Sequence, residues 1–133
     1  MGPLSVKELA AAHADFYMGK GSQQLGARWV ETVWAPDIEI RVSAFDGVRT
    51  RHDWVASHTP AVTPSPQTVG DRPASRTHID RIHVAEDSFV LQGWVAASDG
   101  TPVPLCLVFE VRDGECVTMY EYLDVKRLLA AQA

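Results

Sequence analysis

The chain has 133 residues, 46% of them hydrophobic and 22% charged, with a formal net charge of −5. These values are typical of one soluble globular domain, which we expect to span residues 1–133. The negative charge, without any basic cluster, argues against nucleic acid or an anionic membrane as a partner. The sequence opens without a long apolar run, so we expect neither a signal peptide nor a membrane span, and a cytoplasmic location.

The first half of the chain predicts three helices and one strand. Ser5 and Glu8 form a capping box that opens a helix over about residues 6–18. Ser22 caps a second helix that ends at about Trp34, and Thr50 with Asp53 opens a short third helix that ends near His58. Residues 38–43 alternate apolar and polar side chains, which predicts a strand. The residues expected to face inward from the first two helices are Val6, Leu9, His13, Phe16, Tyr17, Leu25, Trp29, Thr32 and Val33.

The second half of the chain predicts four antiparallel strands. They cover about residues 77–85, 89–97, 102–111 and 115–123. The segments 98–100 and 112–114 both end in glycine and suit three-residue hairpin loops. Residues 59–76 are rich in proline and predict a long loop, either a lid over a pocket or a disordered connector. Asp124 precedes a short helical run over 125–131 and is interpreted as its N-cap.

The predicted strands are apolar on both faces, so both faces need cover. One face carries Phe89, Leu91, Gly93, Val95, Val103, Leu105, Leu107, Phe109, Val117, Met119, Glu121 and Leu123. The three predicted helices can cover only this one face. The other face carries Trp94, Tyr120 and Tyr122, residue types enriched in interfaces, and we expect it to pair two copies as a homodimer.

Two cysteines, Cys106 and Cys116, lie on adjacent predicted strands. They are offset by about four residues, or roughly 13 Å, which is too far for a disulfide. We interpret them as core or interface thiols in a reduced compartment.

The order of these elements, with Trp34-Ala35-Pro36-Asp37-Ile38 and the run from Val111 to Asp124, resembles the SnoaL-like branch of the nuclear-transport-factor-2-like superfamily. This superfamily includes ketosteroid isomerases, polyketide cyclases and limonene epoxide hydrolases. The resemblance implies an α+β fold: a cone-shaped, curved antiparallel sheet with three N-terminal helices packed on its concave face. It also implies a mostly apolar pocket for a small hydrophobic molecule, a dimer, and no metal or cofactor.

The functional positions of these relatives are mostly not matched. Val42 stands where ketosteroid isomerases place a general base, and Leu107 where they place an oxyanion-stabilising acid. The stretch 93–95 lacks the Arg-x-Asp pair of limonene epoxide hydrolases. The acid on the last strand of the hydrolases matches Glu121, so the resemblance implies one shared carboxylate.

Glu121 is the first candidate for catalysis. It lies between Met119 and Leu123 on the face expected to point inward, where burial should raise its pKa and suit it to proton transfer. The alternative role of Glu121 is purely structural, as a buried acid paired with His13, Tyr17 or an arginine such as Arg28.

His78 and Asp80 on the first of the four strands are the other catalytic candidates. If Val84 faces Phe89, both point into the cone, with Asp80 in one row with Gly93, Leu105 and Glu121. Gly93 would then leave room for the ligand. A turn of different length would send Thr77, Ile79, Arg81 and His83 inward instead.

The remaining candidates would contact the substrate rather than react with it. Tyr17 and His13 could donate hydrogen bonds into the pocket, with core packing as the alternative. Asp46 and His52 border the expected pocket mouth. The full set of predicted substrate-binding residues is Tyr17, His13, Val42, Trp54, His58, Gly93, Leu107 and Met119. The five histidines and two cysteines lack metal-binding spacings, so we expect no metal and no cofactor.

These observations lead to two hypotheses. The first is a small-molecule enzyme that uses acid–base chemistry on a hydrophobic substrate, as a cyclase, isomerase, dehydratase or hydrolase. The second is a non-catalytic module that binds a small ligand or forms a dimer.

Overall fold

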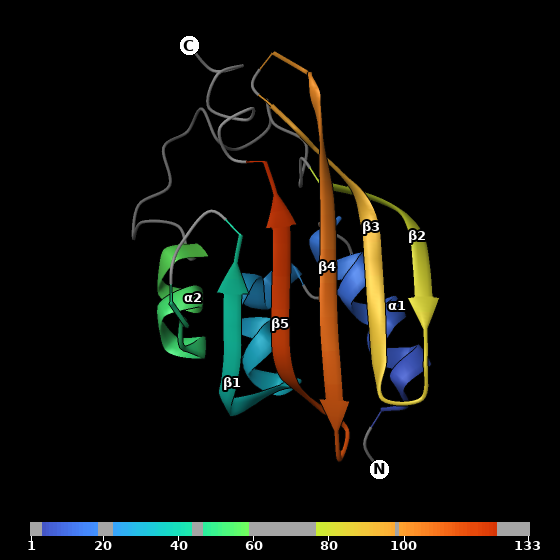
Figure 1. Cartoon of the computed structure of the whole chain (residues 1–133). Coiled ribbons are helices and arrows are strands. Elements are labelled where there is room, and N and C mark those ends of the chain that lie inside the picture. Colours follow the sequence, from blue (N-terminus) through green and yellow to red (C-terminus); the bar gives the residue numbers. More distant parts are fainter. Residues whose placement is uncertain (1–3, 19–22, 44–46, 59–76, 98, 125–133) are drawn as a thin grey trace.

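The structure is a computed structural model that describes residues 4–18, 23–43, 47–58, 77–97 and 99–124 (Figure 1). Its elements in chain order are α1 (Val6–Tyr17), the 3₁₀ helix η1 (Gln23–Thr32), β1 (Trp34–Val42), α2 (Arg51–His58), β2 (Thr77–Val84), β3 (Ser88–Ala96), β4 (Pro102–Arg112) and β5 (Glu115–Leu123). The predicted cap at Ser22, Asp46, the loop 59–76 and the helical run 125–131 lie outside the described residues.

The five strands form one curved sheet in the order β1-β5-β4-β3-β2. β1 runs parallel to β5, and the other neighbours are antiparallel. The helices lie behind this sheet in Figure 1, with α1 against β2 and β3 and α2 beside β1. The α+β architecture with helices on one face is therefore as predicted.

The ends of the helices follow from local hydrogen bonds. The capping box at Ser5 and Glu8 is present and begins α1. The Thr50 hydroxyl accepts the backbone N–H of Asp53 at 3.0 Å and begins α2. The second helix differs from the prediction: it is a 3₁₀ helix that ends at Thr32, because Trp34 already belongs to β1. Thr32 is exposed instead of buried, and its hydroxyl donates to the carbonyl of Trp29.

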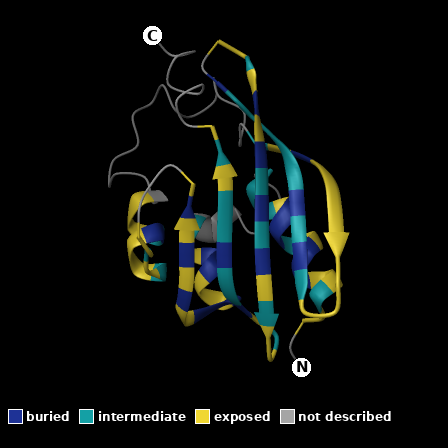
Figure 2. Cartoon of the chain, viewed as in Figure 1, coloured by how far each residue is buried: buried dark blue, intermediate teal, exposed yellow. Residues whose placement is uncertain are grey.

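The helix-covered face, called the inner face below, holds the core (Figure 2). Alternate residues of β4 are buried, and the β3 residues that pair with them share this face. The buried strand residues of this face are Ile38, Ile40, Val42, Ile79, Phe89, Leu91, Val103, Leu105, Leu107, Phe109, Cys116 and Met119. The predicted faces of β3 and β4 are confirmed.

The turn between β4 and β5 is one residue shorter than predicted. Arg112 pairs with Glu115, so the loop is Asp113-Gly114, and both residues have positive φ, as a two-residue type I′ turn requires. A bulge at Val117 then returns the residues from Thr118 onward to the faces that were predicted for them. Before the bulge, Cys116 instead of Val117 enters the core. Glu121 consequently pairs with Leu107 and not with Leu105.

None of the described helices is long and apolar enough to cross a membrane.

Candidate functional site

Glu121 lies near the end of β5 in a row of apolar neighbours. Its strand partners are Val42 on β1 and Leu107 on β4, both buried. Met119, two residues earlier on the same face, is fully buried. The predicted positions of these residues on the inner face are therefore correct, and they give Glu121 apolar walls on three sides.

The environment of Glu121 favours its protonated form. Burial raises the pKa of its carboxyl group above the ordinary value of 4.5, and the charge of Arg49 offsets part of this rise. The side chain is half-buried, so part of it remains accessible. A partly accessible carboxyl group whose pKa is raised holds its proton more firmly than an exposed one, and it can still exchange that proton with a bound molecule.

Tyr17, the last residue of α1, brings a phenol group near this carboxyl group. Its hydroxyl oxygen is buried. Burial, followed by the charges of Glu121 and Cys116, raises the pKa of the phenol well above 10.0. Tyr17 therefore stays a neutral hydroxyl group at ordinary pH and can act as a hydrogen-bond donor but not as a base.

His13 does not point a polar atom into a pocket. It is fully buried, its Nδ1 lies 2.8 Å from the carbonyl of Leu9, and its Nε2 accepts the indole N–H of Trp34 at 2.9 Å. The Cys116 thiol lies 3.9 Å from the same nitrogen. Because both ring nitrogens are engaged, the predicted substrate-binding role is wrong and the packing alternative is correct.

His78 and Asp80 also lie away from the inner face. Val84 pairs with Phe89 as predicted, but a bulge leaves Asp80 without a partner on β3. The bulge reverses the face of the preceding residues, so Ile79 is buried. His78 is exposed and its ring lies tilted against that of Trp94 on the opposite face, with 5.1 Å between the ring centres. The prediction that His78 and Asp80 enter the cone is wrong.

Gly93 leaves no room for a ligand on the inner face. A Cβ atom there would collide with the His78 carbonyl oxygen and lie 2.8 Å from its carbon. The bulged strand β2 fills the space that the sequence assigned to substrate. Glycine is needed here so that two backbones can approach.

The other predicted positions divide between core and surface. Trp54 is buried, with its ring 4.8 Å from that of Trp34, so it belongs to the core and not to a substrate contact. His52 is exposed, and Arg28 pairs with Glu31 rather than with Glu121. His58 is the last residue of α2, and its side chain lies outside the description.

Two contacts were not predicted from the sequence, one beside Glu121 and one in the core. Arg49 lies before α2 and forms an isolated bridge with Ile40, which places it beside the edge of β1. Trp34 supplies the donor for His13. Residue periodicity carries no signal for either contact, because each joins segments through tertiary structure.

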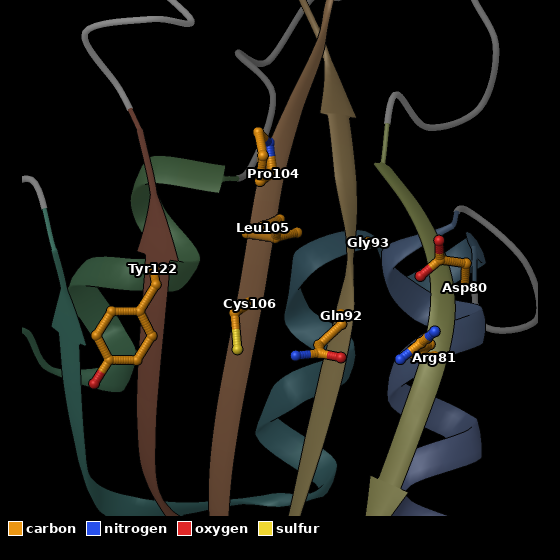
Figure 3. Close-up of a pocket in the computed structure, with 8 residues that line it drawn as sticks. All are labelled: Asp80, Arg81, Gln92, Gly93, Pro104, Leu105, Cys106 and Tyr122. Atoms are coloured by element: carbon orange, nitrogen blue, oxygen red, sulfur yellow. The ribbon is translucent and has the colours of Figure 1, made fainter.

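The face of the sheet opposite the helices, called the outer face, carries a shallow hollow of ≈ 460 Å³ (Figure 3). Asp80 and Arg81 of β2 border it on one side and Tyr122 of β5 on the other. Its remaining lining residues are Gln92, Gly93, Pro104, Leu105 and Cys106. Tyr122 is 52% exposed.

The architecture was compared with proteins of known structure. An NTF2-like protein of unknown function from Burkholderia pseudomallei superposes with a TM-score of 0.63 over 96% of this chain and 98% of that chain, at 17% identity. The chain has the NTF2-like fold. A protein from Jannaschia sp. CCS1, provisionally described as a SnoaL-like polyketide cyclase, gives a TM-score of 0.58 at 13% identity, covering 88% of this chain and 83% of that chain.

The NTF2-like fold does not by itself indicate an activity. A de novo designed protein, NT-9, shares it with a TM-score of 0.60 and 14% identity, over 98% of this chain and 95% of that chain. No protein-family model matches the chain, and no curated protein matches it by sequence. The function must therefore be argued from the residues of the site.

Within the described ranges, no three or more His, Cys, Asp and Glu side chains gather so that they could hold a metal ion.

Proposed function

We propose that this protein is a small-molecule enzyme that binds a hydrophobic substrate beside the accessible part of Glu121 and acts on it by acid–base chemistry. The observation that carries this proposal is Glu121, a half-buried carboxyl group with a raised pKa between the buried side chains of Val42 and Leu107. An ionised carboxyl group is costly in such surroundings, and groups with perturbed pKa values concentrate at active sites.

In the proposed reaction Glu121 transfers the proton and Tyr17 assists. The neutral phenol donates a hydrogen bond to a carbonyl or hydroxyl oxygen of the substrate and stabilises negative charge that develops there. The charge of Arg49 offsets part of the rise in the Glu121 pKa and so favours the ionised form, which is the form that accepts a proton. Cyclisation, isomerisation, dehydration and hydrolysis each fit this pair.

The test compares Glu121→Gln with Glu115→Gln, a matched change at an exposed carboxylate on the same strand. Cyclic ketones and epoxides would be screened for binding and for turnover. If the protein is an enzyme of this kind, Glu121→Gln should lower turnover by about 10²- to 10⁴-fold while the ligand still binds. Glu115→Gln should change neither turnover nor binding. If ligands bind but neither the parent nor any variant turns them over, the protein is a binding module instead.

We also propose that the outer face pairs two copies of the chain, around Trp94, Tyr120 and Tyr122. A two-fold interface must be self-complementary, and this face presents both an exposed ring, Tyr122, and a hollow beside it. Asp80 and Arg81 give the hollow opposite charges, so a second copy meets both signs.

This pairing predicts a dimer in sedimentation equilibrium. Tyr122→Lys should shift the protein to monomers, whereas Asp15→Lys on the exposed side of α1 should not. A monomeric parent at about 50 μM, or a Tyr122→Lys variant that still dimerises, would contradict the proposed interface.

A further inference from the structure

His13 connects helix α1 to strand β1 through one imidazole ring. A carbonyl oxygen can only accept, so the 2.8 Å contact with Leu9 requires the proton on Nδ1. Nε2 then carries a lone pair and accepts the Trp34 indole N–H at 2.9 Å. The two bonds fix one neutral tautomer and link residues that are 21 positions apart in the chain.

The surroundings hold this connection rigidly in place. His13 and Trp34 are both 0% exposed. The imidazole ring centre lies 4.7 Å from that of Phe109 and 5.2 Å from that of Phe89, on β4 and β3. Trp34 packs edge-on against Trp54. Close packing of this kind leaves the ring little freedom to move.

Tyr17 is one helical turn beyond His13, since the two residues are four positions apart in α1. Residues at this spacing lie on the same face of a helix, about 6 Å apart along its axis. Whatever fixes the rotation and depth of α1 at His13 therefore also fixes where the Tyr17 hydroxyl points. Helix α1 ends at Tyr17, so the phenol is carried by the last residue of the helix.

We propose that His13 is a positioning residue, whose bonds to Leu9 and Trp34 set the placement of the Tyr17 hydroxyl relative to Glu121. This inference rests on the proposed function only in that Tyr17 and Glu121 are its acid–base pair. Burial lowers the pKa of His13 to about 4, so the neutral form on which the bond depends persists at ordinary pH. A protonated ring would direct a second N–H at the indole N–H, and the bond would be lost.

The test follows Tyr17 by NMR with ring-¹³C tyrosine. The chain has three tyrosines, so the Tyr120→Phe/Tyr122→Phe background leaves Tyr17 as the single signal. As pH is varied across the titration of Glu121, the Tyr17 Cζ resonance should shift in one step, and Glu121→Gln should remove that step. Absence of the step in the parent protein would overturn the inference.

Two variants then break the connection at different ends. Trp34→Phe removes the donor, and His13→Phe removes both hydrogen bonds while keeping a ring. We expect the Tyr17 step to shrink by at least half in each variant that remains folded. Val103→Ala, a buried change on β4 away from this connection, should lower stability and leave the step unchanged. Trp34→Phe decides the matter if His13→Phe does not fold.

The step is a readout that a purely structural role would not change. If both variants destabilise the protein but keep the full step, His13 only stabilises the fold and the inference is wrong. Turnover is measured separately. If Glu121→Gln leaves turnover intact while Trp34→Phe shrinks the step, the proposed function fails and the positioning role of His13 stands.

Discussion

Gly93→Ala tests whether β2 or a ligand occupies the space in front of β3. In an ordinary strand this change stabilises a protein by about 0.5–1 kcal/mol, because glycine loses more freedom on folding. Here the added Cβ would collide with the His78 carbonyl oxygen and lie 2.9 Å from the Ile79 Cα. Both neighbours are backbone atoms, which cannot rotate away as a side chain could.

The expected loss of stability can be worked out from the contacts that break when β2 moves away from β3. Moving the first part of β2 away exposes Ile79, which is 7% exposed in the native state, and removing it from the core costs about 2 kcal/mol. Losing one ladder hydrogen bond adds about 1 kcal/mol. Gly93→Ala should therefore destabilise by about 3 kcal/mol, the opposite sign to an unconstrained strand.

Urea denaturation measures this directly. With a slope of about 2 kcal/mol/M, the midpoint should fall by about 1.5 M. Gln92→Ala, at the neighbouring position on the outer face, serves as a control and should change the midpoint by less than about 0.5 M. A Gly93→Ala protein as stable as the parent would refute the close approach of the β2 and β3 backbones, and the space beside Gly93 could then hold a ligand.

Three further predictions follow from the buried titratable groups. The pKa of His13 falls from 6.5 to about 4 on folding, so the unfolded state binds more protons between these pH values. The free energy of unfolding should therefore decrease by about 3 kcal/mol as pH falls from 6.5 toward 4. His13→Phe should remove this pH dependence in urea melts, and a variant with the same pH dependence as the parent would contradict it. Glu121 has the opposite effect, because a carboxyl group whose pKa is raised on folding destabilises the protein above pH 4.5. Glu121→Gln should therefore be more stable than the parent at pH 7 and equally stable at low pH. Equal stability at both pH values would show that the pKa of Glu121 is not raised. In the native protein a thiol reagent should leave Cys116 unmodified, because Cys116 is fully buried and its pKa is raised to about 12. Two thiols titrated without denaturant would refute its burial.

The general fold was predictable because it depends on local and periodic signals. The capping box at Ser5 and the alternation along β3 and β4 are written in short stretches of sequence. They specify which elements form and which face of each strand is buried. The covered inner face and the position of Glu121 on it follow from the same pattern.

The errors in the site came from single-residue irregularities. The bulge at Asp80 moved His78 to the outer face, and the bulge at Val117 placed Cys116 in the core. A bulge depends on cross-strand contacts, and one extra residue leaves no trace in the apolar pattern of a short exposed edge strand. The His13–Trp34 bond was missed for a related reason, since it joins segments distant in sequence.

The measurement that most directly tests the central proposal is the pKa of Glu121. Carboxylate-resolved NMR of the parent, with Glu121→Gln to assign the signal, would be recorded with and without cyclic ketones and epoxides. The proposal predicts a pKa clearly above 4.5 that changes when a ligand binds. A pKa at 4.5 that no ligand changes would contradict a role for Glu121 in proton transfer.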